Sequence, residues 1–481
     1  MNKTVSMPLD VVIMAAGKGT RMKSTLPKVL HRLGGKPLLE HVIDTASQLN
    51  ARSVVVITGH ESKVVQNAIN LIAIKAINTP ARVIFDTYKK INSVIQEPQL
   101  GTGHAVLQTV PVLSDDGMVL VLSGDVPLTQ VDTLQDLIEK SGGDKLALLT
   151  IDFENPAGYG RVVRSHESVQ AIVEQKDAND AQKLIKEVYS GIMAVPAKLL
   201  KGWLARLDNK NAQGEYYLTD IVKFAVADGL TVVAHKIDDA AQVAGVNSPV
   251  QLAELERVYQ LRQAKTLMEQ GVRLADPARF DLRGSLVCGQ DVEIDINSIF
   301  SGQVSLGSGV KVGAHCVISN AVIADGAVIH PFTHIEGETL GVLVGAGALI
   351  GPFARLRPGA TLGKEVHIGN FVEVKNATLA DGAKANHLAY LGDATVGERV
   401  NFGAGSITAN YDGANKHRTV IEADVHIGSN CVLVAPVTIG SGGTVGGGST
   451  ITKSTPAGAL SVARGKQVSI ANWQRPKKIA K

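Results

Sequence analysis

The sequence predicts two domains, an α/β domain followed by a parallel β-helix, and three observations support this fold class. A chain of 481 residues is too long for one ordinary hydrophobic core, so two or more domains are expected. In the first half, short apolar runs alternate with helical patterns, which is typical of a sheet covered by helices. In the second half, apolar residues recur every six residues, a period that neither an α-helix nor an amphipathic strand has.

The first half contains four apolar runs that we expect to be buried strands. Because they alternate with helical patterns, the sheet should be parallel, with helices on both faces. Ligands of such sheets bind beyond the carboxyl ends of the strands. The four runs are Leu9–Ala16, Ser53–Gly59, Met118–Asp125 and Leu146–Ile151, and a helical stretch follows the first run at Leu38–Leu49.

A long helix is expected where the two patterns meet. Ser248 can cap its N-terminus, Pro249 suits the first helical position, and Gln251 completes a capping box. Gly271 can end the helix. Apolar side chains recur at helical spacing at Leu252, Leu255, Val258 and Tyr259. The chain therefore divides into an N-terminal domain over residues 1–247, a helical linker over 248–271 and a C-terminal domain over 272–481.

The six-residue period of the second half indicates a parallel β-helix, in which each repeat supplies one short side of a coil. Small apolar residues then point inward and stack on their counterparts in the next coil. Aromatic residues make up only 4% of the chain, which suits a narrow core. A glycine-rich β-sandwich is the alternative, but it would not keep a strict period over this length. The periodic positions form four series, each with a spacing of six residues: Val304, Val310 and Cys316; Leu306, Val312 and Ile318; Val425, Cys431 and Val437; and Ile427, Leu433, Ile439, Val445 and Ile451.

One insertion interrupts the repeat, at Thr408–Lys416. It is rich in residues that form turns, so it should leave the coil as a loop. A loop expelled from a regular solenoid is a candidate binding site.

Bulk composition narrows the class of protein. Hydrophobic residues make up 45% and charged residues 19%, as in a folded globular protein. The formal net charge is only +3, so we expect no nucleic-acid partner, and since no apolar run approaches ~18 residues we expect no membrane span. Cys288, Cys316 and Cys431 lack both metal spacing and a disulfide pattern, which fits a reducing compartment. No secretory signal is recognisable, and we expect a cytoplasmic location.

The most informative segment follows the first expected strand. The chain breaks there into Gly17-Lys18-Gly19-Thr20 and continues to two cations, Arg21 and Lys28. Free backbone N–H groups and nearby cations hold phosphate groups. The segment lacks the spacing of a P-loop and the third glycine of a dinucleotide fingerprint, and a plain strand–helix turn is the alternative. The Thr-Arg-Met that follows, and the Leu-Pro-Lys that ends at Lys28, favour phosphate binding.

This segment, Ala15-Ala16-Gly17-Lys18-Gly19-Thr20-Arg21-Met22 with Pro27-Lys28, resembles the signature of sugar-1-phosphate nucleotidyltransferases. The resemblance implies a Rossmann-like nucleotidyltransferase domain that makes a nucleoside-diphosphate sugar and releases pyrophosphate. Arg21 and Lys28 would then offset charge on the phosphates, and Met14, Ala15, Ala16 and Gly17 would line the nucleotide.

A carboxylate at another strand end suggests a metal. Ser123-Gly124-Asp125 follows an apolar run, and although such an aspartate can simply cap a helix, a phosphate loop nearby makes Mg²⁺ binding the better interpretation. The resemblance supplies the second ligand, Asn247, which spacing alone does not single out.

The same resemblance implies the rest of the nucleotide-sugar site. Gln96, Gly101 and Thr102 match positions that recognise uracil, while Ser123 and Gly124 match positions beside the nucleotide. Gly160 and Glu174 match positions that hold the sugar. Tyr189 stands where many relatives have asparagine, so a phenol or a backbone contact would replace the amide. His104 is interpreted as structural, since phosphate nucleophiles are already ionised near neutral pH.

From about residue 9 to about residue 476, the chain resembles the bifunctional bacterial N-acetylglucosamine-1-phosphate uridyltransferase/glucosamine-1-phosphate acetyltransferases. The most specific segments of the second half are Gly351–Gly359, Gly369–Lys375, His387–Asp393 and Asn410–Gly413. The resemblance to hexapeptide acyltransferases implies that the β-helix is left-handed. It also implies a homotrimer with acetyl-transfer sites completed between β-helices.

Residue roles in acetyl transfer follow from this resemblance. His387 matches the base that takes a proton from the amine, a task suited to histidine near neutral pH, although an unplaced histidine is more often structural. Arg357 and Lys375 match cations that hold the sugar phosphate; elsewhere on a solenoid they would be ordinary solvated charges. Tyr390 and Asn401 match contacts to the amino sugar. The positions that match acetyl-CoA contacts are Ala404, Asn410, Tyr411, Ser429, Gly447 and Arg464. The Ala404 N–H would face the thioester oxygen. Gly447 stands where a relative can carry alanine.

The sequence therefore predicts a two-step enzyme that uses Mg²⁺, with acetyl-CoA and UTP as co-substrates. Its C-terminal domain would acetylate glucosamine 1-phosphate, and its N-terminal domain would couple the product to UTP. The alternatives are a monofunctional nucleotidyltransferase with a regulatory or oligomerising β-helix, and a non-enzymatic scaffold that only binds nucleotide sugars.

Overall fold

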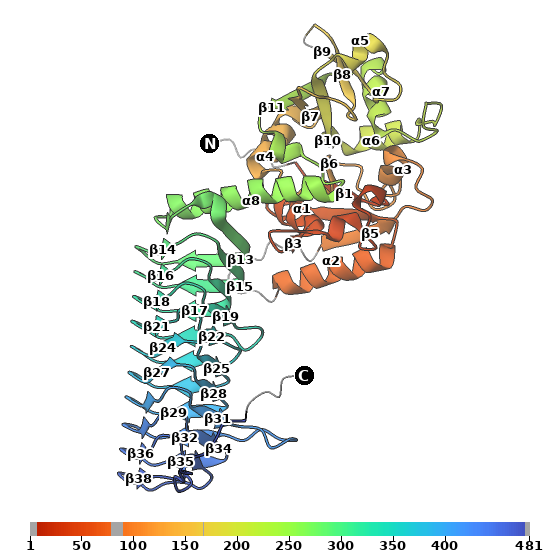
Figure 1. The fold of residues 1–481 in the computed structure, drawn as a ribbon. Coiled ribbons are helices and arrows are strands. Elements are labelled where there is room, and N and C mark those ends of the chain that lie inside the picture. Colours follow the sequence, from red (N-terminus) through yellow and green to blue (C-terminus); the bar gives the residue numbers. More distant parts are fainter. Residues whose placement is uncertain (1–6, 78–89, 167, 477–481) are drawn as a thin grey trace. The chain divides into compact units, whose positions relative to one another are not determined.

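The computed structural model describes residues 7–77, 90–166 and 168–476 (Figure 1). Residues 1–6, which bear on the predicted absence of a secretory signal, lie outside these ranges. The chain forms two compact units, Met1–Tyr259 and Gln260–Lys481. No helix within the described ranges is both long enough and apolar enough to cross a bilayer.

The N-terminal unit is built on a sheet with the strand order β11-β7-β10-β6-β1-β4-β5, and β8 and β9 extend it beside β10. All four predicted runs are strands. The strands are β1 (Leu9–Ala15), β4 (Ser53–Thr58), β5 (Ile91–Ile95), β6 (Met118–Ser123), β7 (Leu146–Asp152), β8 (Arg161–Ser165), β9 (Ser168–Val173), β10 (Glu187–Pro196) and β11 (Val232–Ile237), with a separate pair β2 (Arg32–Leu33) and β3 (Lys36–Pro37).

The sheet is mixed rather than purely parallel. β1, β4, β5 and β6 run parallel to one another, and β7 runs parallel to β11. β10, which lies between β6 and β7, runs antiparallel to both. A parallel strand would need a long crossover connection, whereas between β7 and β10 the chain forms the antiparallel pair β8–β9 and a helix of only four residues, Asp180–Lys183. The carboxyl edge of β1 and β6 still carries the predicted glycine loop and Asp125.

Both faces of the sheet are buried, as predicted for an α/β fold. Along β1, Val11 and Ile13 pack into one apolar cluster while Val12 packs into another, because successive side chains point to opposite faces. The helices are α1 (Leu38–Ser47), α2 (Ser62–Ile77), α3 (Thr102–Leu107), α4 (Val131–Ser141), α5 (Asp180–Lys183), α6 (Ala197–Leu204), α7 (Ile221–Ala227) and α8 (Pro249–Glu269).

Helix α8, which covers most of the predicted linker, contributes apolar side chains to the core of each unit. Leu255 is buried in an apolar cluster of the N-terminal unit, in which Tyr259 is partly buried, whereas Ala264 and Leu267 belong to the core of the C-terminal unit. Its apolar positions therefore serve two cores, and the division between the units falls after Tyr259.

The C-terminal unit is a parallel β-helix, and Figure 1 shows its short strands stacked coil upon coil. All of the predicted six-residue positions are buried, none more than 4% exposed. One row of strands runs β12 (Arg273–Leu274), β14 (Glu293–Ile294), β16 (Lys311–Val312), β18 (Val328–Ile329), β21 (Leu349–Ile350), β24 (His367–Asn370), β27 (Lys384–His387), β30 (Asn401–Phe402), β33 (His426–Ile427), β36 (Thr444–Val445) and β38 (Leu460–Ser461).

Two further rows begin on the long strands β13 (Phe280–Cys288), β15 (Ser298–Leu306) and β17 (Val317–Ile323). One continues with β19 (His334–Glu336), β22 (Arg355–Leu356), β25 (Glu373–Lys375), β28 (Tyr390–Gly392), β31 (Ile407–Ala409), β34 (Val432–Val434) and β37 (Thr450–Ile451). The other continues with β20 (Val342–Val344), β23 (Thr361–Leu362), β26 (Thr378–Leu379), β29 (Ala394–Val396), β32 (Thr419–Ile421) and β35 (Val437–Ile439).

Two insertions leave the coils at the corner between these last two rows. The first, residues 337–341, separates β19 from β20, and the second, residues 410–418, separates β31 from β32. The coils above and below keep their parallel register. The second insertion is the predicted loop, and its residues 411–416 are exposed.

Candidate active sites

The glycine loop lies at the carboxyl end of β1 and contacts Lys28. Gly19 has a left-handed backbone with φ of 61°, and a Cβ added there would lie 2.7 Å from the Cβ of Lys28. Glycine is therefore required for the loop to approach the lysine so closely. Arg21 follows on a short 3-10 helix, Thr20–Met22, and is exposed.

Lys28, Asp125 and Asn247 meet at this edge of the sheet. The Lys28 Nζ donates to Asp125 Oδ2 at 2.5 Å and to Asn247 Oδ1 at 3.0 Å. The side chains of Lys28 and Asp125 are only 15% and 18% exposed. A backbone hydrogen bond from Val246 N–H to the Asp125 carbonyl, 2.9 Å, brings the two metal-ligand candidates together.

The chemistry of this cluster fits a divalent cation. Its two oxygens, a carboxylate and an amide, already surround one positive charge, the Lys28 ammonium. Mg²⁺ prefers oxygen ligands and usually takes few of them from protein, with phosphate and water supplying the rest. The described residues contain no group of three or more His, Cys, Asp or Glu side chains that could hold a metal ion.

The strand ends beside the cluster are tightly packed. Gly124 N–H donates to the Met14 carbonyl at 2.9 Å, and a Cβ at Gly124 would lie 3.3 Å from the Cβ of Ala15. Ala15 and Ala16 are buried, while Gly17 is exposed. The backbone of the candidate nucleotide-binding segment is thus fixed by neighbours on both sides.

The predicted uracil-binding residues form a second group. Gln96 is only 3% exposed, and its Nε2 donates to the Gly101 carbonyl at 2.9 Å. The Thr102 hydroxyl accepts a hydrogen bond from Leu218 N–H at 3.0 Å. His104 contacts the Gln96 amide, with its Nδ1 3.2 Å from Nε2, in keeping with a structural histidine.

The predicted sugar-binding residues also lie together. A Cβ at Gly160 would lie 3.6 Å from Glu174 Oε1, and Tyr189 N–H donates to the Gly160 carbonyl at 2.9 Å. Burial raises the pKa of Glu174, while a hydrogen bond from the Thr219 hydroxyl, 2.9 Å, partly offsets this shift. Thr219 lies far along the chain from Glu174, and nothing in the sequence points to the pair.

The side chain of Tyr189 is buried in the N-terminal unit. It is only 8% exposed, and its hydroxyl is buried without a hydrogen-bond partner among the described residues. Burial, and then the charge of Glu174, raise the pKa of the phenol well above its usual value, so it stays neutral. The backbone of Tyr189 positions Gly160, whereas the phenol lies in the apolar cluster of the sheet.

In the β-helix, His387 has a hydrogen-bond partner one coil away. Its Nδ1 lies 2.9 Å from Asn370 Oδ1, and because that carbonyl oxygen can only accept, Nδ1 carries the proton. Nε2 is left as the basic nitrogen. His387 is exposed and borders, with Asn370, an open hollow of about 490 Å³. The sequence interpretation did not assign a role to Asn370.

The two candidate phosphate-binding cations lie in adjacent coils. The Arg357 Nη1 donates to Glu373 Oε1 at 2.8 Å, and its Nε is buried without a partner among the described residues. The positive charge of Arg357 is the main cause that lowers the pKa of Lys375, and Lys416 adds to it. Lys416, from the inserted loop, is thus a third cation near this candidate phosphate site, and the sequence interpretation missed it.

The remaining predicted acceptor-binding residues are Tyr390 and Asn401, which lie on different rows of strands. Tyr390 is half-buried, and its ring lies directly over Gly392, where a Cβ would collide with it. Any larger residue at position 392 would force the Tyr390 ring to move. Asn401 is exposed on β30.

Four of the predicted acetyl-CoA residues lie in successive coils at one corner. Asn430 N–H donates to the Ala404 carbonyl at 2.7 Å, and Gly448 N–H donates to the Ser429 carbonyl at 2.8 Å, which stacks Ala404, Ser429 and Gly447. Arg464 donates through Nη1 to the Gly447 carbonyl at 2.9 Å.

The other two residues lie at the inserted loop. Asn410 donates to Asp393 Oδ2 at 2.5 Å, and Asp393 Oδ1 accepts from Asn376 at 2.5 Å. Tyr411 is 63% exposed, and its hydroxyl donates to the Gly413 carbonyl at 2.6 Å. Asp393 therefore fixes the start of the loop, a role that its position in the sequence motif did not reveal.

These two folds and two groups of side chains define a class of protein, a transferase that carries a nucleotidyltransferase domain and a hexapeptide-repeat domain in one chain. Family comparison agrees with this class. Residues 11–191 match the family described as MobA-like NTP transferase domain, and residues 341–376 and 418–453 match the bacterial transferase hexapeptide family of six repeats.

Relatives that match the chain over nearly its full length identify the family. The "Bifunctional protein GlmU" of Albidiferax ferrireducens is 73% identical over 474 residues, which cover 98% of this chain and 100% of the relative. Proteins of the same name from Polaromonas sp. and Herminiimonas arsenicoxydans are 72% and 54% identical, with 99% and 98% of this chain covered and 100% of each relative. The chain belongs to the family of bifunctional GlmU proteins.

Proposed function

We propose that this protein is a bifunctional enzyme of UDP-N-acetylglucosamine synthesis. Its C-terminal unit transfers the acetyl group of acetyl-CoA to the amine of glucosamine 1-phosphate and releases coenzyme A. Its N-terminal unit transfers the uridylyl group of UTP to the resulting N-acetylglucosamine 1-phosphate and releases pyrophosphate. The three free cysteines fit a cytoplasmic location.

The observation that carries this proposal is the presence of two separate sets of reactive groups, one in each unit. Lys28, Asp125 and Asn247 meet beside a glycine loop in the N-terminal unit. His387 and Asn370 pair in the β-helix, in the coils that also hold Arg357 and Lys375. A monofunctional nucleotidyltransferase would need only the first set, and a binding scaffold would need neither.

In acetyl transfer, His387 acts as a general base. Its Nε2 takes a proton from the amine of glucosamine 1-phosphate while the nitrogen attacks the thioester carbonyl, and the C–S bond then breaks to release coenzyme A. Asn370 holds the imidazole in the required tautomer. Arg357 and Lys375 bind the sugar phosphate, Tyr390 and Asn401 bind the amino sugar, and the Ala404 N–H stabilises the negative charge that develops on the thioester oxygen.

Acetyl-CoA is held by the stack of Ala404, Ser429 and Gly447, by Arg464 and by the start of the inserted loop at Asn410 and Tyr411. The support for this assignment is the alignment of these residues along one corner and at the next loop.

In uridylyl transfer, a phosphate oxygen of N-acetylglucosamine 1-phosphate attacks the α-phosphorus of UTP, and the bond to pyrophosphate breaks. Asp125 and Asn247 would hold Mg²⁺, which neutralises phosphate charge when bound. Arg21, Lys28 and the N–H groups of the Gly17 loop bind and orient the phosphates. Gln96, Gly101 and Thr102 hold uracil, and Gly160, Glu174 and the backbone of Tyr189 hold the sugar.

We also propose that the protein is a homotrimer. Apolar side chains such as Phe332, Phe353 and Phe371 are about half exposed along the β-helix, and surfaces of this kind are commonly buried between subunits.

The test measures the two products separately. We expect His387→Ala to abolish coenzyme A release and to leave pyrophosphate release intact, and Asp125→Ala to do the reverse. Each variant is the folding control for the other, because the activity that it retains reports an intact chain. A wild-type protein that releases no coenzyme A with glucosamine 1-phosphate, or loss of both activities in either folded variant, would contradict the proposal.

A further inference from the structure

We propose that Lys28 is an internal counter-cation that occupies the place of the metal between Asp125 and Asn247 until a divalent cation binds together with nucleotide phosphates. On metal binding the ammonium would leave these two oxygens and pair with phosphate instead. The inference rests on the proposed uridylyl-transfer site. Its new element is a competition between the Lys28 ammonium and the metal ion for Asp125 and Asn247.

The geometry shows that the ammonium takes both ligand oxygens at once. Lys28 Nζ lies 2.5 Å from Asp125 Oδ2 and 3.0 Å from Asn247 Oδ1. Lys28 is 15% exposed and Asp125 is 18% exposed, so the pair is largely shielded from water. A magnesium ion held by both Asp125 and Asn247 at about 2.1 Å would compete with the ammonium for the Asn247 oxygen and for the charge of the Asp125 carboxylate.

The structure also shows how the ammonium can move without disturbing the fold. The root of the Lys28 side chain is fixed, since its Cβ packs against the backbone of Gly19. Beyond that point the side chain is a flexible stem with a compact charge at its end. The same packing places it beside the Gly17–Thr20 loop, whose backbone N–H groups are the predicted phosphate site. An ammonium released from Asp125 therefore has an acceptor nearby when phosphate is present.

This arrangement couples metal binding to nucleotide binding. Without nucleotide, a metal ion must displace Lys28 from two oxygens and leave it without an ionic partner. With nucleotide, the displaced ammonium gains the phosphates. The free energy of coupling is reciprocal, so UTP should strengthen metal binding as much as the metal strengthens UTP binding.

The experiment measures Mn²⁺ binding to the full-length chain by the electron paramagnetic resonance signal of free Mn²⁺, with and without UTP and without sugar phosphate. We expect Lys28→Met to bind Mn²⁺ without nucleotide at least tenfold more tightly than wild type. We also expect UTP to strengthen Mn²⁺ binding by a smaller factor in Lys28→Met than in wild type.

Two further variants make the result specific. Lys23→Met removes an exposed positive charge near the same loop and should bind Mn²⁺ like wild type. Asp125→Asn combined with Lys28→Met should lose the tenfold gain, which assigns the gain to this cluster. Equal Mn²⁺ affinity of Lys28→Met, Lys23→Met and wild type would overturn the inference, as would an equal effect of UTP on Lys28→Met and wild type. Because the measurement is of binding, it fails separately from the proposed function, which fails if no pyrophosphate is released.

Discussion

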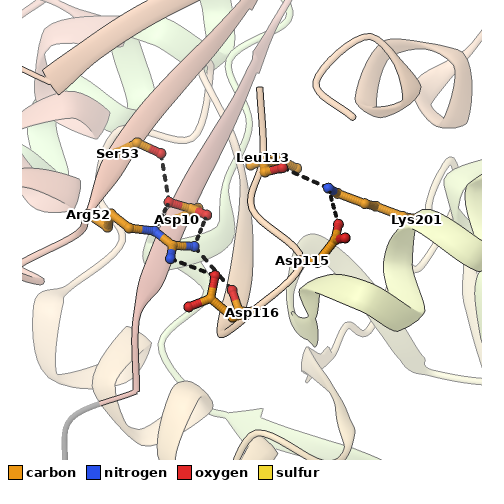
Figure 2. A network of polar contacts seen from close by, with 7 residues as sticks. All are labelled: Asp10, Arg52, Ser53, Leu113, Asp115, Asp116 and Lys201. Carbon is orange, nitrogen blue, oxygen red and sulfur yellow. Dashed lines mark hydrogen bonds and ion pairs between the residues drawn. The ribbon is translucent and has the colours of Figure 1, made fainter. Parts of the chain in front are cut away.

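Replacing Arg52 with methionine should destabilise the N-terminal unit strongly, at a site away from the proposed chemistry. Figure 2 shows the network to which Arg52 belongs. Arg52 donates through Nε and Nη2 to both oxygens of Asp10, at 3.1 and 2.6 Å, and through Nη1 to Asp116 at 2.9 Å. Ser53 adds a hydrogen bond to Asp10 Oδ1 at 2.7 Å. The network joins the start of β1 to the start of β4.

The expected loss of unfolding free energy depends on which charged group each substitution leaves buried. Asp10 is 1% exposed, so Arg52→Met leaves a buried carboxylate with Ser53 as its remaining side-chain partner. Breaking a buried ion pair in this way costs about 3–5 kcal/mol, and we expect about 3 because the serine remains. Asp10→Asn leaves Arg52 with Asp116 as its ionic partner, and since the Arg52 side chain is 33% exposed, the change should cost about 1 kcal/mol.

Urea unfolding followed by the fluorescence of Trp203 measures this effect, because Trp203 is buried in the N-terminal unit. With a slope of about 2–3 kcal/mol per molar urea, Arg52→Met should lower the midpoint by about 1–1.5 M. Asp116→Asn is the control, since Asp116 is 69% exposed and its pair should contribute less than about 1 kcal/mol. Equal costs for Arg52→Met and Asp10→Asn would refute the reasoning, because the argument depends on which charge stays buried.

Two other predictions concern stability at acid pH and acetyl transfer. Burial, and then the charge of Lys36, lower the pKa of His41 from 6.5 to about 4, so below pH 6.5 the unfolded chain takes up a proton that the folded chain does not. As the pH falls from 6.5 to 4, the unfolding free energy of wild type should therefore fall by about 1.4 kcal/mol per pH unit relative to that of His41→Gln. If the urea midpoints of the two proteins shifted equally between pH 7 and pH 5, the prediction would be contradicted. Asp393→Asn should raise the KM for acetyl-CoA several-fold with pyrophosphate release unchanged, because an NH2 donor would replace one of the two oxygens that accept from Asn376 and Asn410. An unchanged KM would show that Asp393 does not position the loop.

Much of the fold could be predicted because it depends on local patterns. The β-helix core follows from a period that every coil repeats, and positions such as Ile427 and Ile439 are buried as expected. α8 begins one residue after its predicted cap, Ser248. The antiparallel direction of β10 was missed, since no local pattern reveals that β8 and β9 form a hairpin before it.

The candidate sites also contain some contacts that a local sequence pattern predicts and others that it does not. Asn370 and His387 are 17 residues apart, as are Asn376 and Asp393, and this separation is one coil. Such partners can be read from a sequence once the coil length is known. Lys28 and Asp125 are 97 residues apart, and the strand order of the sheet is not the chain order, so only the structure reveals that the lysine pairs with the predicted metal ligands.

The shared corner of the two insertions has a consequence for how this architecture can change. Residues 337–341 and 410–418 both emerge between the same two rows of strands, and the neighbouring layers remain in register. Chain length can therefore vary at that corner while the stacking order is preserved. An insertion at that corner can add exposed polar or aromatic side chains, such as Lys416 and Tyr411, without changing the stacked coils.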